Sequence, residues 1–457
     1  MLALRARVPL RIALAGLAAT LVAVAVRAER RAAVPSGAVS IHVKLRADPA
    51  VAPLHAIAAT TAPLFTHLAP GTHDERSKWL AVTARGEDVA WVMAQLLADP
   101  AVAEAFLAPD ITVAGRGADD AVVDDSCPIT TPSFESYQGY LGPAPGGIDA
   151  PAAWRRGQRG AGVWFADVEG GWNAAHEDLP GERIKHVAGT RYRSPMWRQH
   201  GTAVLGEVVG RDNGKGVVGI APDVERVFTS SIGGTTVADA IDAAAHELRP
   251  GDVLLIELQG GGPRGRYIPV EYWDDVFDAV SAATKRGVVV IEAAGNGAED
   301  LDHEVYGEKF DRTRRDSGAI MIGAGGPPRG GYADRERLDF SNYGARVDVQ
   351  GWGRKVATLD YGDLQACAGA DRHYTGEFSG TSSASPIVAG AAVILEGIAR
   401  GRGEWIAPRE LRELLRRTGT PQAGDTREPI GPRPDLARAI PAVERREVPL
   451  SRDQLFE

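Results

Sequence analysis

A serine stands where a helix is predicted to begin near the C-terminal end of this chain. Ser382 lies within the sequence GTSSASP at residues 380–386, and the apolar run that follows predicts a buried helix. A hydroxyl at this position gains from the positive end of the helix dipole, and the backbone N–H of the serine is free to bind a developing oxyanion. The pattern indicates a nucleophile, although a Ser/Thr-rich helix cap alone would look the same.

A serine hydroxyl becomes a good nucleophile only beside a base that a carboxylate orients. His200 opens a run of small and apolar residues, which predicts a tightly packed helix that begins at the histidine. Asp167 ends an apolar run at residues 162–167 that predicts a strand. Each residue taken singly can be structural. Together they predict that Asp167 orients His200 and that His200 activates Ser382.

These motifs resemble those of the subtilisin-like serine peptidases, the subtilases, over about residues 134–443. The order Asp, His, Ser is the order in subtilisin. A fourth motif, AAGNG at residues 293–297, follows a strand-like run. The resemblance implies that Asn296 and the Ser382 N–H bind the oxyanion, and that the chain is a serine endopeptidase working through an acyl-enzyme. The alternative is a subtilase-like binding protein that no longer turns over.

The chain departs from the family pattern in two places. Asp167-Val168-Glu169 stands where the family commonly has Asp-Ser-Gly or Asp-Thr-Gly. The second carboxylate lies on the same face of an extended segment, where it could raise the His200 pKa or bind an arginine. The family's substrate-binding run, Ser-Leu-Gly, is matched here by Leu258, Gln259 and Gly260.

Further acids lie near the predicted site. Glu257 and Glu292 fall in strands that the family's sheet order makes neighbours, and with Glu169 they predict a coupled cluster of buried carboxylates. The alternative is three separately satisfied acids. An acidic loop at residues 299–304 could favour basic residues in the substrate, although a solvated loop is the simpler interpretation.

A polar loop at residues 211–222 is similar to a loop that binds calcium in many subtilases. Calcium takes six to eight oxygen ligands. The resemblance implies side-chain ligands from Asp178, Asn213 and Gln138, and backbone carbonyls from Arg211, Lys215 and Val217. The alternative is a polar surface turn that binds no metal.

Strand-like and helical patterns alternate through the catalytic region, at residues 253–258, 270–285, 288–293 and 320–323. This rhythm predicts an α/β fold, in which helices cover both faces of a parallel sheet. Ligands bind such sheets beyond the carboxyl ends of the strands, and Asp167, Gly260 and Asn296 fall at such ends. The expected fold and the expected chemistry therefore agree.

A small α+β unit is predicted at residues 38–115. Alternating runs at 39–45 and 78–84 predict strands, and apolar residues at helical spacing predict a helix between 87 and 106. The unit resembles a subtilase propeptide, which would assist folding and block this enzyme in cis. The alternative is an unrelated N-terminal domain. An acidic linker at 116–133 would join it to the enzyme and could be cleaved.

The remaining segments bear on location and partners. Arginines precede an apolar stretch at residues 12–26, which predicts a signal peptide at 1–28 and a secreted or periplasmic protein. An uncleaved signal anchor would instead tether the protein to a membrane. Cys127 and Cys367 could form one disulfide. A net charge of -9 favours no nucleic-acid partner, so the expected partners are proteins or peptides, without stable membrane association. Residues 444–457 read as a charged tail.

Overall fold

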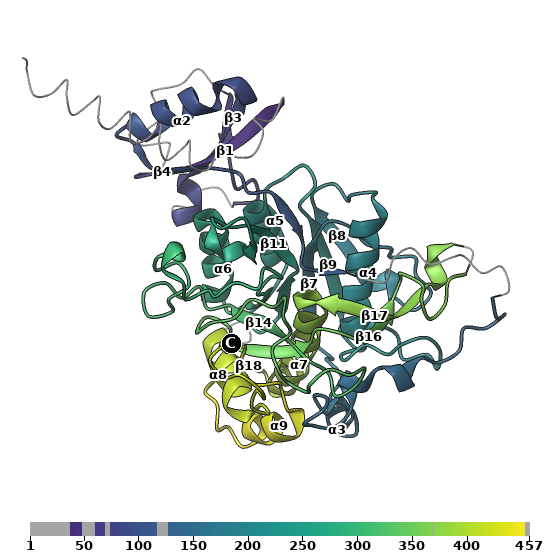
Figure 1. The fold of residues 1–457 in the computed structure, drawn as a ribbon. Coiled ribbons are helices and arrows are strands. Elements are labelled where there is room, and N and C mark those ends of the chain that lie inside the picture. Colours follow the sequence, from purple (N-terminus) through teal and green to yellow (C-terminus); the bar gives the residue numbers. More distant parts are fainter. Residues whose placement is uncertain (1–36, 48–59, 69–73, 117–126, 368, 453–457) are drawn as a thin grey trace, which may run out of the picture. The chain divides into compact units, whose positions relative to one another are not determined.

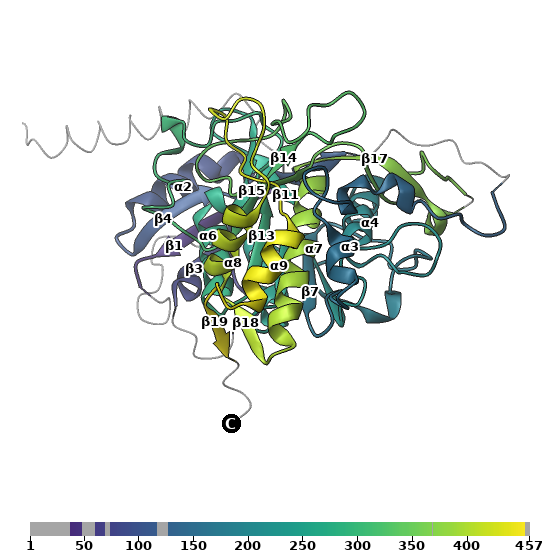
Figure 2. The ribbon, with the colours of Figure 1, turned by 90° about the horizontal axis from the view of Figure 1, so that it is seen from below.

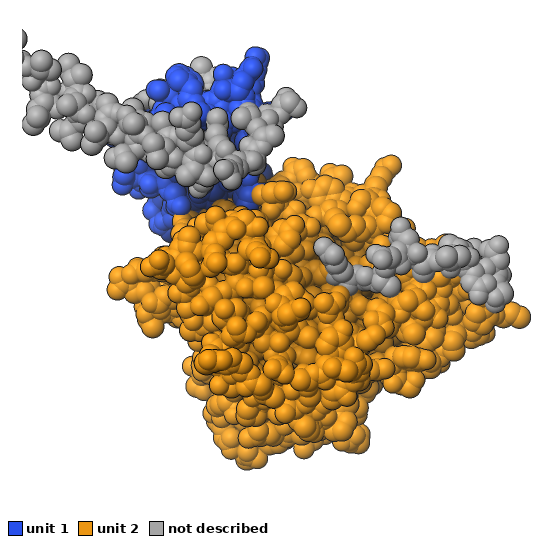
Figure 3. Space-filling model, viewed as in Figure 1, with its two compact units in different colours: residues 1–109 blue, residues 110–457 orange. Residues whose placement is uncertain are grey.

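A parallel sheet of seven strands forms the centre of the larger of two units, residues 110–457 (Figures 1 and 3). The computed structural model describes residues 37–47, 60–68, 74–116, 127–367 and 369–452. The predicted signal peptide lies outside these residues. In order across the sheet, the strands are β15 (Val349–Trp352), β14 (Ile320–Gly325), β13 (Val289–Ala293), β10 (Val253–Ile256), β7 (Trp164–Glu169), β9 (Arg226–Ser231) and β8 (Ile184–Ala188).

Helices pack on both faces of this sheet (Figures 1 and 2). Alternate side chains of each strand, such as Val253 and Leu255 of β10, belong to the core shared with α4 (Pro195–Val209) and α7 (Thr381–Arg400). Helices α5 (Val237–His246) and α6 (Asp274–Lys285) contact each other and cover the other face. The strands are buried on both sides, as the continuous apolar runs predicted. The remaining α-helices in the described part of this unit are α3 (Ala150–Trp154), α8 (Pro408–Thr418) and α9 (Leu436–Glu444).

Three small sheets border the main one. β11 (Leu258–Gly261) lies between β12 (Tyr267–Pro269) and β5 (Ile111–Val113), and β17 (Tyr374–Gly380) lies between β16 (Val356–Leu359) and β6 (Gly115–Arg116). β18 (Glu404–Ile406) pairs with β19 (Leu450–Arg452). The predicted tail at 444–457 therefore contributes a strand. Residues 127–133 of the predicted linker also pack on the domain, where Thr131 is buried.

In its described residues, the first unit is an antiparallel sheet with one α-helix. Its strands, in sheet order, are β2 (Thr60–Pro63), β3 (Trp79–Arg85), β1 (Ala38–Leu45) and β4 (Val102–Leu107), and its helix is α2 (Val89–Ala98). The single helix expected between residues 87 and 106 is thus a helix followed by a strand. Pro100 explains the break, because Asp99 before it takes an extended conformation with ψ 123°.

One helix among the described residues, α7, is long and apolar enough to cross a membrane. Every residue of its apolar window is buried inside the protein, in contact with the sheet and with α4. It is therefore a core helix.

Candidate active site

Three adjacent strands and two helices bring the predicted catalytic residues together. β7 lies beside β10, and β10 beside β13, so the carboxyl ends of these strands meet at one edge of the sheet. Asn296 follows β13, and Ser382 lies in the first turn of α7. His200 lies inside α4, which begins at Pro195 and not at the histidine. Ser194 caps that helix and Pro195 fits its first position.

The acid beside the histidine is Glu169, and the assignment of Asp167 to that place was wrong. His200 Nδ1 contacts the Glu169 Oε1 atom, and both side chains are fully buried. Asp167 Oδ2 instead accepts a hydrogen bond of 2.6 Å from the Trp172 indole. Both acids point to one side of β7, but only the longer side chain at the strand's last residue reaches the imidazole. The position of Glu169 in the motif could have identified this acid from the sequence, since Gly170 and Gly171 directly follow it as small residues follow the family's acid.

Small residues make room for this pair. A Cβ atom on Gly201 would lie 2.6 Å from Glu169 Oε2 and 2.3 Å from the carbonyl oxygen of Gly171. The His200 ring packs edge-on against Phe378, with ring centroids 5.3 Å apart. Burial lowers the pKa of His200 to about 3 and raises the pKa of Glu169 well above its ordinary value. Both shifts have the same cause, because removal from water disfavours the charged form of each group.

Two N–H groups converge on one carbonyl oxygen of the chain itself. The backbone N of Ser382 donates to Ala114 O over 3.0 Å, and Asn296 Nδ2 donates to the same oxygen over 2.5 Å. Asn296 Oδ1 accepts hydrogen bonds from both the backbone N and the hydroxyl of Thr381, which fix the direction of its amide. The two predicted oxyanion donors therefore share one acceptor.

The predicted substrate-binding run pairs with a segment of the chain that occupies the site. β5 lies antiparallel to β11, with Val113 opposite Leu258 and Ile111 opposite Gly260. Gln259 Nε2 donates to Val113 O over 2.7 Å, and its Oε1 accepts from the backbone N of Asn296. Gln259 therefore links the bound segment to the oxyanion loop, a role that its residue type alone did not indicate.

Four buried carboxyl groups gather behind the nucleophile, and we call Asp167, Glu169, Glu207 and Glu257 the catalytic acid cluster. All four are fully buried. Burial raises the pKa of each, and the charges of Asp167 and Glu169 raise that of Glu257 further. Ser385 donates to Glu257 Oε1 over 2.7 Å. Within the described part of the chain, no arginine or lysine forms an ion pair with any member.

Glu292 belongs elsewhere, so the predicted trio of Glu169, Glu257 and Glu292 is only partly correct. Glu292 Oε1 accepts from the backbone N of Glu271 over 2.9 Å, and its pKa is raised to about 8 by burial and then by Glu271. Glu207 was not expected. It lies in α4 two turns beyond His200, and that spacing placed it on the same side of the helix.

The residues expected to bind calcium lie close together. Asp178 Oδ1 accepts from the Asn213 amide and its Oδ2 from the backbone N of Val217, each over 2.8 Å. Gln138 Oε1 accepts from the backbone N of Val218, and Lys215 pairs with Glu177. Hydrogen bonds thus satisfy the side-chain oxygens of Asp178 and Gln138, and as arranged these residues do not form an oxygen cage for calcium. Calcium here stays a prediction.

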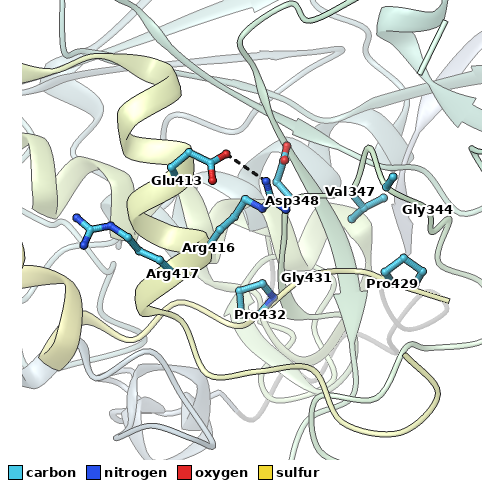
Figure 4. Close-up of a pocket in the computed structure, with 10 residues that line it drawn as sticks. Gly344, Val347, Asp348, Glu413, Arg416, Arg417, Pro429, Gly431 and Pro432 are labelled. Atoms are coloured by element: carbon cyan, nitrogen blue, oxygen red, sulfur yellow. Dashed lines mark hydrogen bonds and ion pairs between the residues drawn. The ribbon is translucent and has the colours of Figure 1, made fainter. Parts of the chain in front are cut away.

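Two other features lie outside this site. A disulfide joins Cys127 to Cys367, whose Cα atoms are 5.5 Å apart. The hollow of about 350 Å³ in Figure 4 lies beside α8, with Glu413, Arg416 and Arg417 on its wall. None of the residues that line it is a candidate catalytic residue.

The geometry agrees with the sequence profile of the Subtilase family, which matches residues 121–431. The chain belongs to the subtilase family. It is therefore a hydrolase of the serine-type endopeptidase class. The subtilase is 30% identical to Subtilisin DY of Bacillus licheniformis over 255 residues, which cover 54% of this chain and 81% of that protein. It is 27% identical to an intracellular serine protease of Paenibacillus polymyxa over 287 residues, covering 59% and 78%.

Solved structures share the fold. Fervidolysin from Fervidobacterium pennivorans aligns with a TM-score of 0.59 and 19% identity, over 89% of this subtilase and 61% of that chain. A protease from Pseudoalteromonas arctica aligns with a TM-score of 0.52 and 21% identity, over 69% of this chain and 100% of that chain.

Proposed function

We propose that this subtilase is an exported serine endopeptidase that works through an acyl-enzyme, with Ser382 as nucleophile, His200 as base and Glu169 as orienting acid. One observation carries the proposal. A peptide carbonyl of the chain accepts hydrogen bonds from both Asn296 Nδ2 and the Ser382 N–H, which is the contact that a substrate carbonyl would make.

The chemistry follows from these contacts. Ser382 Oγ attacks the carbonyl carbon while His200 Nε2 takes the hydroxyl proton, and the two donors stabilise the charge that develops on the oxygen. His200 then gives that proton to the leaving amine. Glu169 at Nδ1 holds the imidazole in the tautomer that leaves Nε2 free, and it stabilises the imidazolium. Water activated by His200 hydrolyses the acyl-enzyme in the second half of the reaction.

The competing proposal is a subtilase-like protein that binds peptides without cutting them. A complete set of nucleophile, base, acid and oxyanion donors favours the enzyme, because a binding protein has no use for it. A fluorophosphonate probe distinguishes the two. Stoichiometric labelling of the processed protein that disappears in Ser382→Ala and persists in Ser281→Ala, a serine in α6, supports the enzyme. Full labelling of Ser382→Ala, or an unlabelled parent that cuts no peptide, contradicts it.

We further propose that the unit of β1 to β4 is a propeptide that acts on the enzyme in cis. Its last strand, β4, ends at Leu107, and the chain continues directly into the segment bound at the oxyanion donors. Purified Ser382→Ala should retain this unit, whereas the parent should lose it. Loss of the unit from the purified variant would contradict cleavage by the chain itself.

Export to a secreted or periplasmic location is part of the proposal. The disulfide between Cys127 and Cys367 supports it, since such bonds persist in oxidising compartments. Fractionation of the native host, with mass spectrometry of the N-terminus, tests it. Recovery of the processed protein only from the cytoplasm contradicts export, and recovery of an intact N-terminus in the membrane fraction indicates the tethered alternative.

A further inference from the structure

The segment from Ile111 to Arg116 passes through the candidate active site in an extended conformation. On the N-terminal side of Ala114 it forms β5 and pairs with β11, and on the C-terminal side it forms β6 and pairs with Ser379 and Gly380 of β17. The backbone N of Ala114 donates to Glu257 O over 3.2 Å. The segment is thus held on both sides of one residue, as a substrate must be on both sides of the bond that is cut.

We propose that the Ala114–Gly115 peptide bond is the bond at which this enzyme cuts its own chain, and that the enzyme's substrates share the pattern of this segment, with a small residue before the cut and glycine after it. The proposal rests on the proposed function. It moves the cut from the acidic linker at 116–133, where the sequence placed it, to the boundary between β5 and β6.

The oxyanion contacts identify the bond. The carbonyl oxygen that meets both donors is that of Ala114, so its carbon is the one that Ser382 Oγ attacks. A Cβ atom on Gly115 would lie 2.7 Å from His200 Nε2 and 3.0 Å from Ser382 Cβ, so the base and the nucleophile both adjoin the residue that leaves. The Oγ–C bond forms, the C–N bond breaks, and the hydroxyl proton passes through His200 to the Gly115 amine. Water then releases the Ala114 carboxylate.

Glycine is required after the cut for a steric reason. The same Cβ atom would lie 2.8 Å from Ser379 O, so a side chain at position 115 would meet the strand on one side and the histidine on the other. Gly380, in the strand beside the segment, must also be glycine, since a Cβ there would lie 2.3 Å from Ala114 O and 2.6 Å from Gly115 Cα. Apart from the contact with the histidine, which must stay in place, these contacts are with backbone atoms, which cannot move aside as a flexible side chain can.

The N-terminal side of the segment indicates an apolar, uncharged substrate. Ala114 is fully buried and Val113 nearly so. A Cβ atom on Gly260 would lie 2.3 Å from the Trp273 ring and 3.1 Å from Ile111 Cδ1, so the glycine leaves room for the ring and for an aliphatic residue three positions before Ala114.

The acidic loop at residues 299–304 does not supply a free buried carboxylate, Glu299, for a basic substrate residue on the N-terminal side of the cut. Glu299, its buried member, accepts the Tyr306 hydroxyl and lies 3.6 Å from an Arg264 nitrogen. Glu299 is therefore already paired within the protein and does not select a basic residue in the substrate.

The test of self-cleavage uses the full chain. N-terminal sequencing and intact mass of the processed parent should give a protein that begins at Gly115. Gly115→Val should remain uncut at this bond, whereas Gly37→Val, where a Cβ meets nothing within 4 Å, should be processed like the parent. A primary cut elsewhere, or Gly115→Val cut here at the parent rate, overturns the proposal. If such a protein still labels with the fluorophosphonate probe, the proposed function stands without this inference.

Peptides test the substrate pattern in trans. The processed enzyme should cut Ile-Thr-Val-Ala-Gly-Arg between alanine and glycine. Replacing the glycine by valine, or the alanine by arginine, should lower kcat/KM by about tenfold or more, as overpacking of a fitted site does. Equal rates for the three peptides overturn the pattern.

Discussion

Two groups of buried carboxylates in the same domain are held in opposite ways. The catalytic acid cluster contains no cation among the residues that the structure describes. The second group, the Arg346 cluster, consists of Glu271, Glu292 and Asp348 around a fully buried arginine. Two hydrogen bonds of 2.6 and 3.0 Å join Arg346 to Glu271. Burial alone would raise the pKa of Glu271, but the charge and hydrogen bonds of Arg346 bring it below its ordinary value.

The difference shows what burial does with and without a partner. Without a cation, burial raises the pKa of each carboxyl group in the catalytic acid cluster, because removal from water disfavours the charged form. Beside Arg346, the charge and hydrogen bonds of the arginine lower the pKa of Glu271, and the same charge opposes, without overcoming, the effect of burial on the pKa of Glu292. A cation inside the catalytic acid cluster would draw Glu169 away from His200. Excluding cations there therefore preserves the contact that the proposed mechanism needs.

The largest expected effect concerns which carboxyl group of the catalytic acid cluster orients the histidine. Glu169→Gln should lower kcat by about 10⁴-fold, the loss expected when an amide replaces the orienting acid and the imidazole takes the wrong tautomer. Asp167→Asn should change kcat less than about tenfold, because its amide oxygen can still accept the Trp172 indole. Steady-state kinetics on a peptide substrate measure both. A larger loss in Asp167→Asn than in Glu169→Gln would restore Asp167 as the catalytic acid.

The second prediction concerns stability in the Arg346 cluster. Arg346→Met should lower the free energy of unfolding by about 3–5 kcal/mol, because it leaves buried carboxylates unpaired. Arg427→Ala is the control, since that arginine is 89% exposed where it pairs with Asp425, and solvent screens such a surface pair, so its loss should change the stability little. Denaturant unfolding in the Ser382→Ala background avoids self-digestion. Equal losses for the two variants would mean that the cluster does not depend on its cation.

Asp178 offers a third case, a buried carboxylate whose pKa is raised to about 7 by burial despite two hydrogen bonds. We propose that calcium binds here by displacing the Asn213 amide from Asp178 Oδ1, and that the ion then supplies the cation that this carboxylate lacks. A metal that binds only the folded state at a hundredfold excess over Kd adds about 2.7 kcal/mol, so EDTA should lower the Tm of the processed protein. Asp178→Asn should abolish that response. An unchanged melting curve in EDTA would rule out the metal and group Asp178 with the catalytic acids.

The smallest expected effects are on pH dependence, and they have opposite signs. The folded-state pKa of Glu257 is raised, so its contribution to stability is present below its unfolded value and is lost as pH rises, by up to about 1.4 kcal/mol per pH unit. Glu257→Gln should therefore gain on its parent as pH increases from 5 to 8. Glu271 has a lowered pKa, and its contribution is lost as pH falls through that value.

Glu271→Gln should accordingly be most destabilised near neutral pH and approach its parent only as pH falls below 4.5, the ordinary pKa of the group. Thermal melts of both variants and the Ser382→Ala parent across this range test the pair. Parallel pH profiles for the two variants would show that the two clusters titrate alike, and would contradict the proposed difference between them.

The sequence predicted the residues whose chemistry depends on local context. Ser382, His200 and Asn296 lie in short motifs at element ends, and the α/β rhythm that positions them is a local pattern. Glu169 was misassigned because residue type was given more weight than position in the motif, and the reach of a side chain from a strand end is not local. Glu292 was grouped with the wrong acids for a related reason. Its hydrogen-bond partner is the backbone N of Glu271, and the nearby Arg346 comes from a distant loop, so no periodicity in sequence reveals this arrangement.

The burial of α7 has a consequence for how activity and folding are linked. The helix that carries Ser382 at its first turn is buried along almost its whole length, from Thr381 to Ala399. Its backbone amides can exchange with deuterated solvent only when the domain opens as a whole, because local fraying cannot expose a central core helix. The nucleophile therefore has no partly unfolded form in which it moves independently, and amide exchange in α7 should report the same opening event that ends catalysis.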